Sequence, residues 1–266
     1  MITAGVDVGA VSAKAAIVKD GELLASSIIP TSSDAKKSAI EVMSKTLKEA
    51  ELELNDIDYI VATGYGRFTI PFAQKQVTEI TCHAKGASFL FPDTRTIIDI
   101  GGQDSKAIRI SENSEVSDFV MNDKCAAGTG RFLEVMAKVL EIDIGNLGEL
   151  SLRSKNNISI SSMCTVFAES EVVSLIASGV CREDIALGLH RAIAERVVGM
   201  ANKILLTESV TLTGGVMNNV GVVHALKEKI QMSINIPDNP QIIGALGAAI
   251  IAKGYCKTPK FNSLKP

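Results

Sequence analysis

The sequence predicts an α/β fold of two duplicated lobes, and two observations carry this prediction. Short apolar stretches typical of buried strands alternate with stretches whose apolar residues recur at helical spacing. An Asp-x-Gly motif also ends such a strand twice, at residues 7–9 and 99–101, and each copy is followed at the same distance by a lysine, Lys14 or Lys106. Two copies of this kind indicate one duplicated unit and not a solenoid.

The first copy lies in a segment rich in strands. Residues 2–7 predict a buried strand, and residues 15–29 predict two further strands around a turn at Asp20-Gly21. Residues 59–62 predict another buried strand. A helix is expected before it, because apolar residues recur at helical spacing at Ile40, Met43, Leu47 and Ala50.

The second copy opens the second half of the chain. Residues 96–100 predict a strand that continues into a β-rich stretch with a polar turn at residues 112–114. Residues 185–206 predict a long helix, and residues 210–213 predict a strand. A final apolar helix is expected to open at Gly244.

The chain is long enough, at 266 residues, to form two lobes of ordinary size. We expect a first lobe of residues 1–95 plus about 242–266 and a second lobe of residues 96–241. The two Asp-x-Gly turns would then face each other across a cleft. The polar stretch 257–266 predicts a frayed tail.

Composition narrows the class of protein. Apolar residues make up 46% of the chain and charged residues 21%, which is typical of a globular domain. A net charge of −3 gives no reason to expect nucleic acid or a membrane as partner. The sequence shows no apolar run of membrane-spanning length and no signal peptide, so we expect a cytoplasmic protein with reduced cysteines.

Two of the five cysteines stand just before segments that predict helices. Cys125 lies in the segment 122–132, and Cys164 lies in the segment 161–169. Each thiolate would therefore lie near a helix N-terminus, where free N–H groups and a partial charge of about +0.5 favour anions. This setting suits a nucleophile, a thiolate metal ligand or an anionic iron–sulfur cluster. The simpler alternative is that both are unrelated core cysteines.

The helices after these two cysteines are predicted from their apolar residues. The first has one apolar face, at Phe132, Val135, Met136, Val139 and Leu140. The second has apolar positions at Val166, Val172, Val173 and Ile176. No Cys-x-x-Cys occurs, so a four-thiolate site would require two chains to share one centre. The remaining cysteines have no comparable glycine or helix-start context and predict structural thiols: Cys82, Cys181 and Cys256.

The paired Asp-x-Gly turns suit a nucleotide. Glycine lets backbone N–H groups approach a phosphate, and a nearby carboxylate can hold Mg²⁺ directly or through water. Gln103 and Asp104 follow the second turn and are candidates for orienting the attacking water. The candidate phosphate and magnesium residues are Asp7, Gly9, Ser12, Lys14, Asp99, Gly101 and Gly102. A single Asp-x-Gly is more often a plain turn, whereas two matched copies favour the nucleotide.

A third glycine motif follows the strand at residues 210–213. Gly214-Gly215 would let a flat adenine lie against the backbone, with Asn218 available for hydrogen bonds. Gly-Gly after a strand is usually only a turn. The sequence contains no P-loop and no dinucleotide fingerprint. His83 is a possible acid–base group, but a lone histidine after a cysteine is more often structural.

Together these residues resemble the ATP-dependent activators of 2-hydroxyacyl-CoA dehydratases. That group belongs to the wider ATPase family that includes the nucleotide-binding subunits of benzoyl-CoA reductase. The resemblance runs through nearly the whole chain, and its most specific parts are the two cysteine motifs. The matching segments are residues 7–9, 62–67, 82–84, 99–104, the two cysteine motifs, 213–216 and 244–249.

The resemblance implies an actin-like, ribonuclease H-like ATPase fold that binds ATP or ADP with Mg²⁺. It also implies a homodimer that holds one [4Fe–4S] cluster, with Cys125 and Cys164 of each chain as ligands. Ferredoxin or flavodoxin would supply the electron, and ATP would drive its transfer to the dehydratase or a related reductase. Gly214, Gly215, Asn218 and Gly244 would take part in nucleotide binding.

One departure from the family concerns the first phosphate loop. Ala10, Val11 and Ala13 stand where family members often carry Ser or Thr, so Ser12 is the hydroxyl left in the loop. We therefore expect several phosphate contacts from backbone groups alone. Other functions with these residues are an ATPase subunit or activator of a benzoyl-CoA-type reductase, a small-molecule kinase, and an assembly protein that binds nucleotide without turnover.

Overall fold

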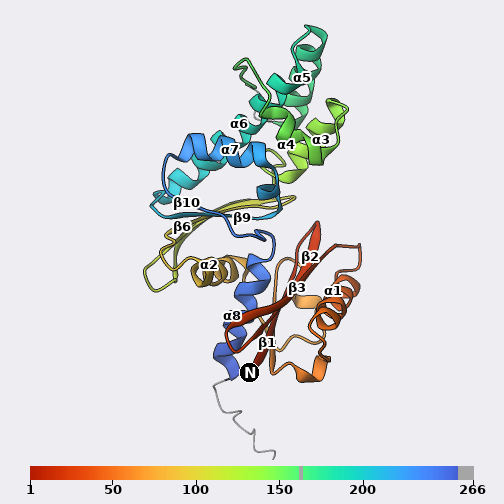
Figure 1. Ribbon diagram of the computed structural model, residues 1–266, viewed down its shortest axis with the longest axis vertical. Helices are drawn as coiled ribbons and strands as arrows, with labels where there is room; N and C mark the ends of the chain where they lie inside the picture. The colour runs from red at the N-terminus through yellow and green to blue at the C-terminus, as the bar shows by residue number, and fades with distance from the viewer. Residues whose placement is uncertain (162–163, 257–266) are drawn as a thin grey trace, which may run out of the picture. The chain divides into compact units, whose positions relative to one another are not determined.

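A computed structural model describes residues 1–161 and 164–256 of the chain. The chain divides into two compact units. Unit 1 consists of residues 1–90 together with the C-terminal residues from 241 onward, and unit 2 consists of residues 91–240. Figure 1 shows the elements of both units.

Unit 1 is built on a five-stranded sheet in the order β3-β2-β1-β4-β5. The strands are β1 (Ile2–Val8), β2 (Ser12–Lys19), β3 (Glu22–Pro30), β4 (Tyr59–Thr63) and β5 (Lys75–Gln76). The helices are α1 (Ala35–Glu49), α2 (Glu79–Leu90) and α8 (Ile243–Cys256). β1 pairs antiparallel with β2 and parallel with β4, so the ends of β1 and β4 lie at the same edge of the sheet.

Helices cover both faces of this sheet because the strands are apolar on both sides. Ala15 and Ile17 of β2 belong to the core that includes α1, whereas Ala16 and Val18 pack against α8. α2 packs against α8 (Figure 1). The two helices approach closely at Gly247, where a Cβ atom would overlap the backbone carbonyl of Cys82. The close packing of α8 on α2 therefore explains the glycine at position 247.

Unit 2 repeats this topology in a sheet of the order β10-β9-β6-β7-β8. The strands are β6 (Thr96–Ile100), β7 (Ser105–Ile110), β8 (Val116–Asn122), β9 (Val210–Thr213) and β10 (Ile234–Asn235). The helices are α3 (Gly130–Val139), α4 (Ile144–Ser151), α5 (Thr165–Ala177), α6 (Arg182–Ala201) and α7 (Val220–Ile230). In both units an antiparallel three-stranded meander is followed by two parallel strands.

Short 3₁₀ turns join some of these elements. They are η1 (Leu54–Asp56), η2 (Arg67–Thr69), η3 (Asn202–Ile204) and η4 (Gly215–Asn218). The long helix that the sequence predicts over residues 185–206 instead runs from Arg182 to Ala201. Its end was predicted too late because Leu205, although apolar, adopts a left-handed conformation after η3. The predicted polar tail at residues 257–266 lies outside the described residues.

Two predicted apolar faces differ from the structure. Ile40 of α1 is 43% exposed, because the buried face of that helix is centred on Val42 and Met43 instead. In α5, Val172 is buried, whereas Val166 and Val173 are more than half exposed. The apolar face of α3 lies against the core as predicted, with Phe132, Met136 and Leu140 buried. Within the described residues, no helix combines the length and the apolar character needed to cross a membrane.

A buried histidine lies where α4, α6 and α7 meet. His190 of α6 is fully buried, and its Nδ1 lies 2.9 Å from the Ser151 hydroxyl. Ser151 donates its own hydrogen to the carbonyl of Gly148, so Nδ1 of His190 must donate to Ser151. Nε2 is then an acceptor, and among the described residues it has no partner. Burial lowers the pKa of His190 to about 4.

This histidine predicts a loss of stability in mild acid. The pKa is about 4 in the fold and about 6.5 in an unfolded chain, so the unfolded state binds more protons between these values. The free energy of unfolding is therefore unaffected by this histidine above about pH 6.5. It falls as the pH decreases toward 4, by roughly 3 kcal/mol at most. Urea unfolding at several pH values measures this fall. His190→Leu should flatten the dependence, whereas replacing the exposed His224 with Asn should leave it unchanged.

Candidate functional site

The two Asp-x-Gly turns have the same backbone geometry. The N–H of Gly9 donates to the carbonyl of Ser12 over 3.1 Å, and the N–H of Gly101 donates to the carbonyl of Asp104 over 2.9 Å. Each turn joins an antiparallel strand pair, β1 with β2 and β6 with β7. The repeat in the sequence is therefore also a repeat in three dimensions.

The aspartate of each turn forms an ion pair with the lysine that follows it. Asp7 lies opposite Lys14 in the β1–β2 register, and their charged atoms are 3.4 Å apart. Asp99 lies opposite Lys106, at 3.3 Å. Lys106 also contacts Asp104 at 2.9 Å, and its side chain is only 4% exposed. Both lysines therefore neutralise carboxylates at the strand ends and lie close to the predicted phosphate loops.

A Thr-Gly pair at the end of a parallel strand lies beside each aspartate, and the sequence repeat alone does not identify this pair. Thr213, at the end of β9, donates its hydroxyl hydrogen to Asp99 Oδ1 over 2.8 Å. Gly214 follows with φ +94°, and a Cβ atom there would strike the carbonyl of Ile100.

Unit 1 has a Thr-Gly pair at the corresponding place, Thr63 and Gly64, but the Thr63 hydroxyl does not hydrogen-bond to Asp7. Thr63 lies opposite Asp7 in the parallel β1–β4 register. Gly64 has φ +82°, and a Cβ atom there would strike Asp7 Oδ1. The sequence signal that could have revealed these residues is a Thr-Gly pair that ends a strand in each half of the chain. It was hidden because the distance from the Asp-x-Gly motif to this pair differs between the two halves.

The two candidates for positioning water differ in their surroundings. Asp104 is held by Lys106, and its side chain lies over Gly101, where a Cβ atom would be 2.7 Å from Asp104 Oδ1. Gln103, one residue earlier, is exposed. Gly102 is half-buried beside it. The amide of Gln103 is thus the more accessible of the two polar groups.

The candidate adenosine residues follow β9. Gly215 opens η4 and Asn218 closes it, and the Asn218 side chain is exposed. The neighbouring Asn219 has a structural role, since its Oδ1 accepts from the N–H groups of Gly221 and Val222 and so caps α7.

Gly244 lies in unit 1, at the start of α8. A Cβ atom on Gly244 would be 3.0 Å from Asp7 Oδ2 and 3.2 Å from His83 Nε2. The start of α8 therefore packs directly against the first Asp-x-Gly turn. His83, for which the sequence favours a structural role, is buried beside the same carboxylate.

Cys125 is half-buried in the loop between β8 and α3. Asn122 holds this loop from the end of β8: its Nδ2 donates to the carbonyl of Cys125 over 2.8 Å and to that of Ala127 over 3.1 Å. The N–H of Cys125 donates to Asn122 Oδ1 over 3.3 Å. The Asn122 side chain therefore bonds to the loop that carries the cysteine at three backbone groups.

Cys164 is exposed and occupies the N-cap position of α5. Ser161 is tied to the same helix, because its N–H donates to Glu171 Oε1 over 2.9 Å. α3 and α5 are in contact, so the two cysteines precede neighbouring helices (Figure 1). Val166 and Phe167, directly after Cys164, are about two-thirds exposed. An apolar surface thus adjoins the second cysteine.

Two of the three other cysteines, Cys82 and Cys181, differ in their exposure to solvent. Burial raises the pKa of the Cys82 thiol to about 12, so Cys82 is inert at neutral pH. The expectation that Cys181 lacks a helix-start context was wrong, because Cys181 is exposed and occupies the N-cap of α6. The sequence places the predicted start of this helix at residue 185, so Cys181 did not stand at the predicted N-terminus.

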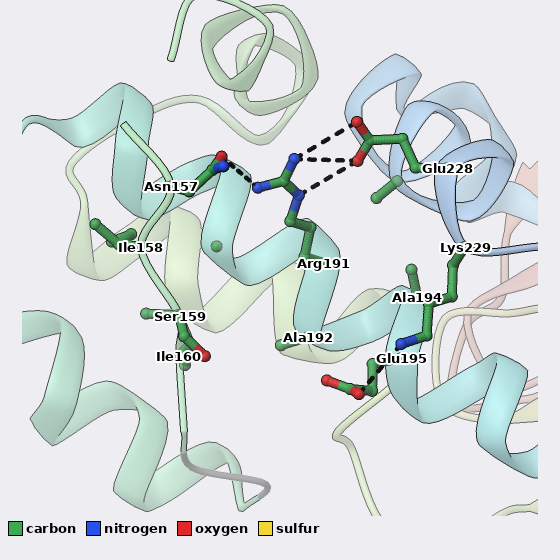
Figure 2. A pocket seen from close by; sticks show the side chains of 12 residues that line it. Asn157, Ile158, Ser159, Ile160, Arg191, Ala192, Ala194, Glu195, Glu228 and Lys229 are labelled. Atoms are coloured by element: carbon green, nitrogen blue, oxygen red, sulfur yellow. Dashed lines mark hydrogen bonds and ion pairs between the residues drawn. The ribbon is translucent and has the colours of Figure 1, made fainter. Parts of the chain in front are cut away.

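A pocket of about 370 Å³ lies between residues 157–160 and the helices α6 and α7. Figure 2 shows the Arg191 guanidinium between Asn157 and Glu228, at 2.6 and 3.2 Å. Lys229 pairs with Glu195 across the same pocket, at 3.3 Å. None of the predicted site residues lines it. The hydrogen bond from Arg191 anchors Asn157 to α6, whereas the two ion pairs join α6 to α7.

Comparison with known proteins places these features in context. Residues 4–252 match the model of the BadF/BadG/BcrA/BcrD ATPase family. The activator of lactoyl-CoA dehydratase from Anaerotignum propionicum is 49% identical over 255 residues, which cover 95% of this chain and 97% of that protein.

Two solved structures are similar over nearly the whole chain. Component A of the (R)-2-hydroxyglutaryl-CoA dehydratase of Acidaminococcus fermentans has a TM-score of 0.94 and 44% identity, covering 97% of this chain and all of that one. The activator of the 2-hydroxyisocaproyl-CoA dehydratase from Clostridium difficile, with bound ADPNP, has a TM-score of 0.91 and 45% identity, covering 97% and 96%.

The fold extends beyond close relatives. A glucokinase of the ROK family from Streptomyces griseus has a TM-score of 0.60 at 13% identity, covering 96% of this chain and all of that one, which shows a shared fold alone. The expected actin-like, hexokinase-like ATPase fold is therefore confirmed, and binding of ATP or ADP is supported.

Proposed function

Because this chain belongs to the BadF/BadG/BcrA/BcrD ATPase family, we propose that it is an ATP-hydrolysing activator that delivers a low-potential electron to a 2-hydroxyacyl-CoA dehydratase. The observation that carries this proposal is the combination of a duplicated nucleotide loop with two cysteines before neighbouring helices. Relatives named for three different 2-hydroxyacyl-CoA dehydratases match this chain over nearly their whole length.

Both Asp-x-Gly turns take part in nucleotide binding in this proposal. Backbone N–H groups around Gly9 and Gly101 bind phosphate oxygens, while Lys14 and Lys106 offset the charge of the nearby carboxylates. Gly214, Gly215 and Asn218 hold the adenosine, and Gly244 keeps the start of α8 close to Asp7. Gln103 positions the attacking water, since Asp104 is already bound by Lys106.

The carboxylates of the two turns fit a magnesium ion that keeps its own water ligands. Both oxygens of Asp99 are engaged, Oδ1 by Thr213 and Oδ2 by Lys106. Asp7 has a contact from Lys14 at Oδ2. Mg²⁺ usually keeps several waters and is bound through one or two carboxylates and the substrate phosphates. Asp7 is therefore the principal candidate, with Asp99 acting through water.

The cysteines fit a cluster shared by two chains. Within the described residues, no group of three or more His, Cys, Asp or Glu side chains could hold a metal ion. Cys125 and Cys164 are free thiols before the N-termini of α3 and α5, where the helix dipoles favour a negatively charged group. When bound, a [4Fe–4S] cluster supplies one-electron transfer at low potential.

A homodimer follows from two ligands per chain. The exposed apolar side chains that begin α5, Val166 and Phe167, suit burial against a second copy. A dehydratase is then the acceptor of the electron, and ferredoxin or flavodoxin is the donor. Ala10, Val11 and Ala13 leave Ser12 as the hydroxyl of the first phosphate loop, so hydrolysis relies on backbone contacts there.

Iron and acid-labile sulfide per chain, with the mass in solution, test this function on protein purified without oxygen. A dimer with about two iron atoms per chain, and ATP hydrolysis in the presence of Mg²⁺, is the expected result. A monomer that holds no iron after attempted reconstitution, but phosphorylates a small molecule, would instead indicate a kinase of this fold.

A second function within the family is an activator or ATPase subunit of a benzoyl-CoA-type reductase. One of the subunits of the benzoyl-CoA reductase of Thauera aromatica is 33% identical to this chain over 261 residues. Incubation of the reduced protein with MgATP and an inactive 2-hydroxyacyl-CoA dehydratase separates the two functions. Dehydration of the acyl-CoA is expected, and its absence alongside reduction of benzoyl-CoA by the corresponding reductase would favour the second function.

A further inference from the structure

The loop that carries Cys125 is attached at one end to the second phosphate loop, residues 101–104, and at the other end to the residue that directly follows it. At the first end, Asn122 closes β8 and lies opposite Ser105, which directly follows the phosphate loop. At the second end, the N–H of Gly130 donates to the carbonyl of Gly101 over 2.9 Å, and that of Arg131 donates to Gly102 over 2.8 Å. A displacement of the phosphate loop is therefore transmitted to both ends of the cysteine loop.

The backbone is tightly packed where Gly130 and Arg131 bond to the phosphate loop. A Cβ atom on Gly130 would be 3.2 Å from the Cα of Gly102 and 3.3 Å from a methyl group of Val216. Val216 lies in η4, the candidate adenosine segment. The start of α3 is thus packed between the two segments of unit 2 that are proposed to bind the nucleotide. Close packing of this kind transmits displacements because interiors deform little.

The Asn122 side chain ties the backbone of the cysteine loop together. Its amide group forms three hydrogen bonds inside the loop, two to the carbonyls of Cys125 and Ala127 and one from the N–H of Cys125. Thr129 closes the far side, donating its hydroxyl hydrogen to the carbonyl of Ala126 over 2.6 Å. Without the Asn122 amide, the backbone at Cys125 would lose its attachment to β8.

We propose that Asn122 is a positioning residue that couples the position of Cys125 to the nucleotide bound at the second phosphate loop. This inference rests on the proposed function, because it names the route by which nucleotide regulates the cysteine site. Asn122 touches neither nucleotide nor cluster in this proposal. It acts by fixing the loop between the phosphate-loop attachments, so that ordering of residues 101–104 by nucleotide also orders Cys125.

The test measures how fast iodoacetamide alkylates Cys125 in the full chain after removal of any iron, with and without ADPNP and Mg²⁺. Peptide mass spectrometry reads Cys125 and, as an internal reference, the exposed Cys181 of the same sample. In the parent protein ADPNP should slow alkylation of Cys125 by about 5-fold, the lower range of coupling between sites, and leave Cys181 unchanged.

Asn122→Asp keeps the size and one acceptor but removes the two donated hydrogen bonds. The rate without nucleotide should then rise by about 5-fold, as expected for a lost hydrogen bond, and ADPNP should slow it by less than about 2-fold. The matched control is Asn113→Asp, the same substitution in the exposed turn between β7 and β8, which should behave as the parent. Calorimetry should show that all three still bind ADPNP, so that a lost effect on Cys125 is not a loss of binding.

Gly130→Ala tests the other attachment, because its methyl group would press on Gly102 and Val216. It should also reduce the effect of ADPNP, whereas Gly199→Ala, with open space around it, should not. The inference would be overturned if ADPNP slowed alkylation of Cys125 in Asn122→Asp as much as in the parent. It would also be overturned if ADPNP left the rate at Cys125 of the parent unchanged, whether or not ADPNP binds. The alkylation assay does not require a cluster. A chain that never holds iron would therefore refute the proposed function, but the coupling between ADPNP and Cys125 would still be decided by the alkylation rates.

Discussion

Lys106→Met is expected to lower the free energy of unfolding by about 3–5 kcal/mol, because it leaves two nearby carboxylates without their cation. Lys106 contacts Asp99 at 3.3 Å and Asp104 at 2.9 Å, and the side chains of Lys106 and Asp99 are only 4% and 5% exposed. Methionine keeps the length and apolar stem of lysine, so the loss reports the charge and not a cavity. Urea unfolding followed by circular dichroism measures it.

A surface lysine provides the control. Lys37 pairs with Glu41 one helical turn away at 3.8 Å, and both side chains are more than half exposed. Lys37→Met should change the free energy of unfolding by less than about 0.5 kcal/mol. Nucleotide affinity should also fall in Lys106→Met, since the uncompensated carboxylates repel phosphate. An effect of Lys106→Met as small as that of Lys37→Met would show that the second Asp-x-Gly turn does not depend on its lysine.

Cys164→Ser is expected to reduce the iron content from about two atoms per chain to a trace, because a four-thiolate site shared by two chains would lose two of its four ligands. The fold should be unaffected. Cys164 is exposed at the N-cap of α5, and serine is a preferred N-cap residue. Anaerobic purification followed by iron and sulfide determination measures the loss, and thermal unfolding checks the fold.

Cys181→Ser is the matched control for this substitution. Cys181 is also exposed and also occupies an N-cap, that of α6, but lacks a place in the two cysteine motifs. Its iron content should equal that of the parent. Equal iron in Cys164→Ser and in Cys181→Ser would exclude Cys164 as a ligand, and equal loss in both would mean that any exposed N-cap cysteine disturbs the centre.

Much of the fold was predictable because the duplication repeats both sequence and geometry. The strand at residues 96–100 and the strand at 210–213 have the predicted bounds. The Asp-x-Gly turns were recognisable since glycine, aspartate and lysine occur at equal spacing in both halves, and an antiparallel register places each aspartate opposite its lysine. Local patterns of this kind survive folding because neighbouring strands pair directly.

Other features could not be read from local pattern. Ile40 fits a helical stripe, yet it is exposed, because the position of the sheet beneath α1 selects the buried face. Thr63 and Thr213 lie opposite their aspartates because strands that are distant in the sequence pair in parallel. The N-cap role of Cys181 depended on where α6 begins, which its apolar spacing alone did not define.

The sequence by itself determined the duplicated architecture, the two Asp-x-Gly turns and the place of Cys125 and Cys164 ahead of α3 and α5, since each depends on residues close together in the chain. Tertiary structure decided how these parts are joined. The attachment of the Cys125 loop to residues 101–104 requires β8 to lie beside β7 and the start of α3 to reach Gly101 and Gly102. Backbone hydrogen bonds between distant segments leave no side-chain signature, so only the folded chain reveals them.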